Sequence, residues 1–142
     1  MSGRVVDSPT ELRRGTATCA TAEVAWELAL DLFFESWRIS DRWSPATALS
    51  FRRHALGLSR LIGVAAVTGS CAVVEIHLSS ARRALAELDA ELERARGVYR
   101  CQTASVAAWV DWSTRLGGQL SRWRLEVLRR PDLSDDSKQA II

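Results

Sequence analysis

Arginine is the residue type in this chain with the clearest chemical potential, because its planar guanidinium group binds phosphate in a bidentate geometry. Residues 38–60 hold five Arg against one Asp, and residues 94–130 hold eight Arg against two carboxylates. Clustered basic residues are typical of surfaces that bind nucleic acid. The candidate nucleic-acid contacts are Arg52, Arg53, His54, Arg60, Arg115, Arg122, Arg124, Arg129 and Arg130.

A structural interpretation of the same arginines stays open. An arginine recurs every seven residues from Arg115 to Arg129, and this spacing suits pairing with carboxylates across a subunit interface. An acidic row with a spacing of four residues offers such carboxylates on a single helical face. Codon usage in a GC-rich genome also explains why Lys138 is the one lysine among 19 basic residues. The acidic row consists of Glu23, Glu27, Asp31 and Glu35.

Residues suited to catalysis or metal binding are few. His54 and His77 are the two histidines, and no zinc-protease, phosphate-loop, nucleophile-elbow or dinucleotide-binding pattern occurs. Cys71 and His77 are six residues apart, a poor spacing for shared metal ligands. The carboxylates of residues 87–93 alternate around one helix, so we expect them to be solvated or to act as helix caps. The sequence predicts no enzyme, no metal and no cofactor.

Six tryptophans are many for a chain of 142 residues. Trp43 follows an arginine in a loop and Trp112 lies off the main apolar row of its helix, so these two are candidates for base stacking or a partner contact. Either of them could instead simply cover a neighbouring residue. Core packing is expected for the four on apolar rows, Trp26, Trp37, Trp109 and Trp123.

Four helices must position these residues. Mostly apolar residues alternate at spacings of three and four, the period of helices packed nearly parallel in bundles. The rows expected to face the core are Ala48, Phe51, Ala55, Leu58, Ile62 and Ala65, then Leu78, Ala81, Leu85, Leu88, Leu92 and Ala95, and finally Val106, Trp109, Ser113, Leu116, Leu120, Trp123 and Val127. The expected helices cover 21–39, 45–67, from 71–79 to 96, and 101–129, with Pro45 in a first turn and Gly97 at a C-terminus. We predict an all-α, up-and-down four-helix bundle over 19–130, with a flexible arm before it (1–18) and a tail after it (131–142).

The first expected helix carries a second apolar row, beyond the row of Val24, Leu28 and Leu32. One bundle face does not require two rows, so the second row indicates self-association. The predicted oligomer interface consists of Glu23, Trp26, Glu27, Leu30, Asp31, Phe33 and Trp37.

Composition sets the class and the compartment. A hydrophobic share of 47%, a charged share of 25% and a formal net charge of +2 describe one ordinary globular domain. No apolar run reaches the roughly 18 residues that a membrane span needs. Three widely spaced cysteines fit reduced thiols. We therefore expect a cytoplasmic protein that binds no membrane.

Several segments resemble one bacterial family of four-helix bundles. Residues 26–29 read Trp-Glu-Leu-Ala, residues 51–58 contain a double arginine, and residues 85–99 resemble the family's Leu-x-Glu-Leu-Glu-x-x-Leu-x-x-Ala run that ends in Gly and an aromatic. The Leu-Gly-Gly at 116–118 is similar to a late family segment. The family includes proteins encoded in intervening sequences of 23S ribosomal RNA genes and the accessory variability determinants of diversity-generating retroelements.

The resemblance implies an assembly and a role. Members form homopentameric barrels of four-helix protomers, and the retroelement branch is a non-catalytic accessory that binds a reverse transcriptase and its template RNA during complementary DNA synthesis for mutagenic retrohoming. The chain is a divergent member, because Gly57 and the residues that follow replace the usual Ser-Ile-Pro and Asn-Ile-Ala-Glu-Gly segments. The alternative is an oligomeric protein scaffold or adaptor that binds no nucleic acid.

Overall fold

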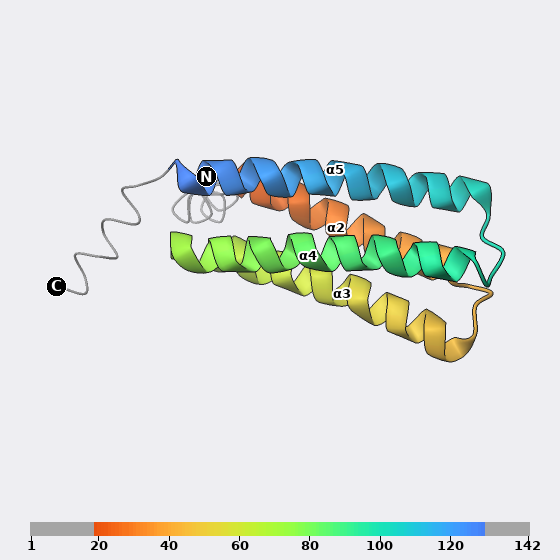
Figure 1. Ribbon diagram of the computed structural model, residues 1–142. Coiled ribbons are helices and arrows are strands. Elements are labelled where there is room, and N and C mark those ends of the chain that lie inside the picture. Colours follow the sequence, from red (N-terminus) through yellow and green to blue (C-terminus); the bar gives the residue numbers. More distant parts are fainter. Residues whose placement is uncertain (1–18, 130–142) are drawn as a thin grey trace, which may run out of the picture.

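A computed structural model describes residues 19–129, and this part of the chain consists of four helices without a strand. The helices run alternately up and down, with α2 beside both α3 and α5, and with α4 against the same two neighbours (Figure 1). The predicted four-helix bundle is therefore confirmed. The helices are α2 Cys19–Ile39, α3 Pro45–Val67, α4 Cys71–Arg96 and α5 Thr103–Leu128. The expected arm at 1–18 and the expected tail at 131–142 lie outside the described residues.

Local sequence signals set the helix ends. Pro45 occupies the first turn of α3, where its missing N–H is not needed. Gly97 follows the last residue of α4 with φ −74° and ψ −16°, so it caps the helix in a right-handed conformation that any residue could adopt. Its N–H donates to the Arg94 carbonyl at 3.2 Å. The predicted position of this cap is confirmed, although the conformational freedom of glycine is not used.

The core faces of three helices agree with the predicted periodicity. On α3, α4 and α5, every residue of the expected apolar row is buried. Leu, Ile, Phe and Trp at these positions fill the space between the helices, and apolar burial of this kind is the main stabilising term of a bundle. The largest fully buried side chains are Trp109, Trp123, Phe51, Leu32, Leu58, Ile62, Leu78, Leu88, Leu116 and Leu120.

Helix α2 packs differently from the prediction. Its buried face combines Leu28 and Leu32 with small residues, and Val24 of the predicted row is 42% exposed. Small side chains let helix backbones approach closely, so α2 needs few large residues to fill its side of the core. This arrangement turns the second apolar row of α2 away from the bundle interior. The small buried residues are Ala22, Ala25, Ala29 and Ser36.

The two tryptophans expected to be exposed pack inside or against the bundle. Trp43 is only 5% exposed and stacks on Tyr99, with ring centroids 5.6 Å apart and an angle of 14° between the ring planes. Trp112 is half-buried and packs against the core. An exposed role for Trp43 is therefore contradicted, and the alternative that it covers a neighbour is confirmed, because the loop that carries it folds back onto the aromatic ring of Tyr99. No helix in residues 19–129 is long and apolar enough to cross a membrane.

Candidate functional site

Arg52 is the candidate contact most deeply engaged by the fold. Its Nε donates to Ser40 Oγ at 2.8 Å, and its Nη2 donates to the Trp37 carbonyl at 3.3 Å. The guanidinium carbon lies 3.9 Å from the centre of the Trp37 ring, a cation–π distance. Arg52 therefore ties α3 to the end of α2, and two of its five N–H groups form hydrogen bonds within the protomer.

The remaining candidates on α3 fall into two groups. Arg53 and Arg60 are exposed and seven residues apart, so they share the outward face of the helix. No ion pair joins either of them to another residue in the described range 19–129. His54 instead faces α4, where its Nδ1 lies 2.8 Å from Glu91 Oε2. Arg53 and Arg60 are thus the two α3 candidates that are exposed and have no ion pair within residues 19–129.

The α5 candidates divide in the same way. Arg115 pairs with Asp111 at 3.2 Å on its own helix, and Arg124 Nη2 lies 3.2 Å from Glu75 Oε1 on α4. Arg122 and Arg129 are exposed, and neither has an ion pair with a residue that the structure describes. Arg130 lies outside the described residues. Two of the α5 arginines therefore keep their guanidinium groups accessible.

The basic residues of α3 and α5 do not share one face of a protomer. Each of these helices packs against α2 and α4, so they lie diagonally opposite each other in the bundle (Figure 1). Arg53 and Arg60 consequently face away from Arg122 and Arg129. A single protomer offers two separate basic faces, and a combined surface requires more than one copy of the chain.

An exposed aromatic surface covers α2 where it meets α3. Trp26, Phe34 and Trp37 are 43%, 60% and 50% exposed, and Leu30 and Phe33 are half-buried beside them. The interior position expected for Trp26 and Trp37 is therefore wrong, because the small residues of α2 take the core side. These five residues are called the aromatic surface below.

Contacts with α3 fix the aromatic surface in place. A Cβ atom at Gly63 would lie 3.3 Å from the Trp26 indole nitrogen, so the absence of a side chain at this position leaves room for the ring. Trp37 carries Arg52 on one face and meets Phe33 edge-on, with ring centroids 6.5 Å apart. The aromatic side chains are consequently supported by α3 while much of their area stays in contact with solvent.

Opposite charges flank the aromatic surface. Glu27 directly follows Trp26, and Asp31 directly follows Leu30. One residue corresponds to a rotation of about 100° around a helix, so both carboxylates lie on the side of the aromatic surface that is away from α3. Both are exposed, as is Glu23, whereas the outward arginines of α3 lie on the other flank. Glu35 departs from the acidic row, since it is buried and its Oε2 lies 3.5 Å from Arg38 Nη1. The surface has an acidic edge and a basic edge.

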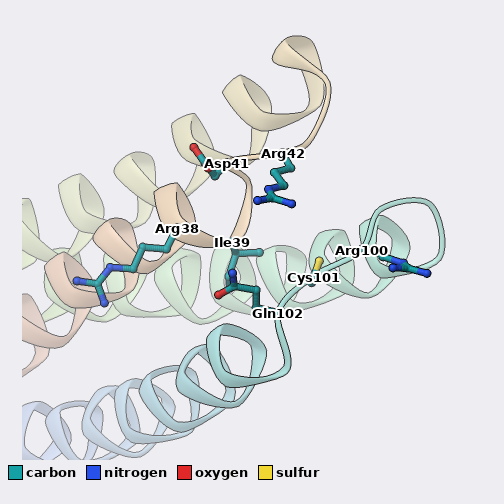
Figure 2. A pocket seen from close by; sticks show the side chains of 7 residues that line it. All are labelled: Arg38, Ile39, Asp41, Arg42, Arg100, Cys101 and Gln102. Carbon is teal, nitrogen blue, oxygen red and sulfur yellow. The ribbon is translucent and has the colours of Figure 1, made fainter.

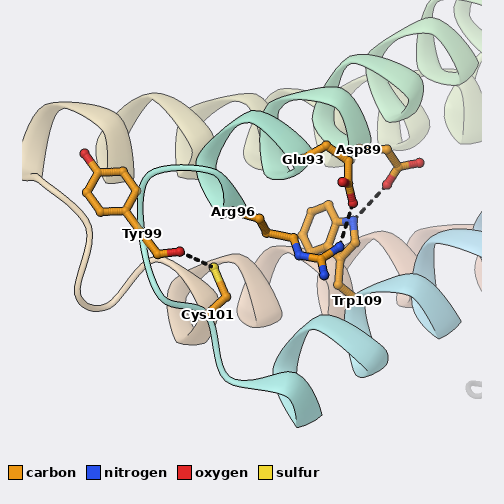
Figure 3. Close-up of polar contacts among 6 residues, drawn as sticks. All are labelled: Asp89, Glu93, Arg96, Tyr99, Cys101 and Trp109. Carbon is orange, nitrogen blue, oxygen red and sulfur yellow. Dashed lines mark hydrogen bonds and ion pairs between the residues drawn. The ribbon is translucent and has the colours of Figure 1, made fainter.

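A half-buried carboxylate joins α4 to α5. Asp89 accepts a hydrogen bond from the Trp109 indole nitrogen at 2.8 Å (Figure 3). It accepts another from Ser113 Oγ at 3.0 Å. The expectation that Asp89 is simply solvated or a helix cap is therefore wrong, and Glu91 also has a specific role through His54. Periodicity showed that these carboxylates do not converge, but it gave no information about their partners on neighbouring helices.

Tyr99 ties the two loops at one end of the bundle together, and no sequence signal indicated this role. Its ring stacks on Trp43 of the α2–α3 loop. Its hydroxyl donates to Ser44 Oγ at 2.9 Å and lies 3.4 Å from Thr47 Oγ1. The α4–α5 loop, which contains Tyr99, is thereby fixed against the start of α3.

The titration of Tyr99 gives a direct test of this contact. The side-chain hydroxyls of Ser44 and Thr47 lower the pKa of Tyr99 below its ordinary value of 10.0, because they can turn to donate to the phenolate. Tyr99 is the one tyrosine in the chain, so tyrosinate absorbance near 295 nm reports on it alone. We expect a midpoint below 10.0, and Ser44→Ala should move it upward. A midpoint unchanged by Ser44→Ala would contradict the contact.

The shift also fixes the sign of a pH effect on stability. Between the folded-state pKa and the unfolded value near 10, the unfolded chain holds a proton that the folded chain has released. The lowered pKa of Tyr99 therefore stabilises the folded state, and this stabilisation is fully present above pH 10. It is lost as the pH falls through the folded-state pKa of Tyr99.

The fold and these surfaces define the class of the protein as a four-helix bundle with exposed aromatic and arginine side chains. Among residues 19–129, no group of three or more His, Cys, Asp or Glu side chains is placed to hold a metal ion. No family model, curated protein or solved structure matches the chain.

Proposed function

We propose that the protein is a non-catalytic, nucleic-acid-binding accessory that assembles into a homo-oligomer and supports a reverse transcriptase. The observation that carries the proposal is the pair Arg53 and Arg60, which project from α3 beside the aromatic surface without a carboxylate partner in the described residues. Guanidinium groups so placed suit phosphate oxygens. The reverse transcriptase and the template RNA rest on the sequence resemblance. The cytoplasmic location rests on the wide spacing of the three cysteines, which fits reduced thiols.

Assembly follows from the aromatic surface and its edges. Exposed Trp, Phe and Arg are the residue types enriched at protein interfaces and their energetic centres. The acidic edge of one copy can meet the basic residues of the next, which suits a closed ring, and the resemblance implies five copies. A ring repeats each basic face around its circumference, so several weak phosphate contacts act together on one RNA.

A second function has its own supporting observation. Arg122 and Arg129 lie on α5, the neighbour of α2, and Glu27 and Asp31 are exposed along α2. If these groups pair between copies, the arginines hold an assembly together and bind no RNA. The protein would then be a scaffold or adaptor for other proteins.

A pair of matched charge reversals distinguishes the two functions. In Arg53→Glu/Arg60→Glu, we expect the affinity for a fluorescently labelled RNA hairpin to fall by at least about tenfold and the salt dependence of binding to become shallower. Arg82→Glu/Arg83→Glu is the control, because it makes the same charge change at exposed positions of α4. Arg52 is unsuitable for this test since it ties α3 to α2.

Mass and absorbance complete the test. Light scattering on the wild-type protein should give an oligomer, with a 260/280 nm absorbance ratio that falls when salt removes bound nucleic acid. RNA binding that both double variants lose equally would contradict the α3 site. An oligomer that binds no RNA and dissociates when Arg122 and Arg129 are reversed would establish the scaffold instead.

A further inference from the structure

A pocket of about 300 Å³ lies between the two loops at the end of the bundle where Tyr99 and Trp43 stack. It is formed by the end of α2, the α2–α3 loop and the segment that leads into α5 (Figure 2). This site is called the loop-end pocket below. Its lining residues are Arg38, Ile39, Asp41, Arg42, Arg100, Cys101 and Gln102.

Three of the seven lining residues are arginines, and they come from both arginine-rich stretches of the sequence. The guanidinium group of Arg42 points into the space between the loops, whereas those of Arg38 and Arg100 extend away on opposite sides (Figure 2). Arg42 and Arg100 have no ion pair with a residue in the described range. Asp41 is the single carboxylate in the lining, so the pocket carries an excess of positive charge.

The start of α5 lies next to the pocket. Gln102 both lines the pocket and precedes the first residue of α5, with an extended backbone and no side-chain hydrogen bond that caps the helix. The first turn of α5 contains no acidic residue. The first N–H groups of a helix lack partners within the helix and carry partial positive charge, which favours an anion.

The pocket is held open by contacts on the neighbouring residues. Tyr99 lies directly before Arg100, and its ring and hydroxyl fix it to Trp43 and Ser44 of the other loop. Arg42 directly precedes Trp43, which is buried. The backbone positions of Arg42 and Arg100 are therefore set before any ligand arrives, so less ordering is needed on binding.

We propose that the loop-end pocket binds a phosphate group, either of inorganic phosphate or of a nucleoside monophosphate. Arginine forks form paired, charge-assisted hydrogen bonds to the oxygens of a tetrahedral dianion. The long, exposed side chain of Arg100 can rotate toward the charge that Arg42 already faces, whereas Arg38 is paired with Glu35. The site is separate from the outward faces of α3 and α5, so the proposal does not rest on nucleic-acid binding by those helices.

Calorimetric titration of the full chain with orthophosphate, at an ionic strength held constant with sodium chloride, tests the proposal. We expect saturable binding that weakens about 100-fold in Arg42→Gln/Arg100→Gln, since each charge-assisted contact contributes roughly tenfold. The control Arg83→Gln/Arg94→Gln removes the same charge from exposed positions of α4 outside the pocket and should leave binding unchanged. Circular dichroism establishes that each variant is folded.

A second titration with adenosine monophosphate identifies the source of the phosphate group. Tighter binding than that of orthophosphate, lost in Arg42→Gln/Arg100→Gln, supports a nucleotide ligand, and equal binding supports free phosphate. The proposal is overturned if orthophosphate shows no saturable binding at millimolar concentration. It is also overturned if the pocket variant and the control lose affinity equally.

Discussion

Asp89→Ala is expected to lower the free energy of unfolding by about 3 kcal/mol, a large share of the stability of an ordinary domain. The Asp89 carboxylate accepts hydrogen bonds from the Trp109 indole N–H and from Ser113 Oγ, both on α5. Trp109 is 1% exposed, so its N–H cannot turn to water when the acceptor is removed. The variant therefore loses charge-assisted bonds and leaves a buried donor without a partner.

Denaturant unfolding followed by circular dichroism measures this loss. Glu87→Ala is the matched control, because Glu87 is an exposed carboxylate on the same helix and should change the stability by no more than about 0.5 kcal/mol. Asp89→Asn keeps an acceptor oxygen for Trp109 and should fall between the two. Equal stabilities of Asp89→Ala and Glu87→Ala would show that the contact with α5 contributes nothing.

Much of the fold could be predicted because burial in a helical bundle follows the period of the helix. The row from Leu78 to Ala95 and the row from Val106 to Val127 repeat at spacings of three and four, and every member of both rows is buried as expected. Pro45 and Gly97 marked two helix ends correctly. These signals are local, so one sequence is sufficient to detect them.

Helix α2 could not be oriented from the same signals. The sequence pattern gives α2 two apolar rows, so Trp26 and Trp37 were expected both to pack in the core and to contribute to an oligomer interface. The structure places Ala25 and Ala29 in the core instead, because a close helix contact needs small side chains and leaves no room for indole rings. The choice between the two faces depends on the neighbouring helices, and the pattern of one helix does not contain that information.

The candidate site was predictable as a set of residue types but not as a geometry. Sequence position alone could not show that Arg52 binds the end of α2, that Arg124 meets Glu75 on α4, or that α3 and α5 are diagonal in the bundle. These facts depend on the register between helices. The loop-end pocket was missed for the same reason, since Arg42 and Arg100 are far apart in sequence and share no motif.

If the proposed oligomer forms through the aromatic surface, Trp26→Ser/Trp37→Ser is expected to convert it into monomers over the micromolar range. A tryptophan at the centre of an interface contributes about 2 kcal/mol or more, so the two replacements together should raise the dissociation constant by at least about 100-fold. The protomer should stay folded, because both rings are about half exposed. Arg52 also keeps its bonds to Ser40 Oγ and to the backbone carbonyl of residue 37, which do not involve the indole ring.

Sedimentation velocity across a dilution series measures the change, with Leu125→Ser/Leu128→Ser as the control. Leu125 and Leu128 are 53% and 52% exposed on α5, so this control removes apolar surface of similar exposure from a helix outside the aromatic surface. If the control dissociates the assembly and the tryptophan variant does not, the copies meet through α5 and the aromatic surface is left to bind another protein. If only the tryptophan variant dissociates, its monomer also shows whether RNA affinity depends on repeating the basic faces, because each monomer keeps Arg53 and Arg60 intact.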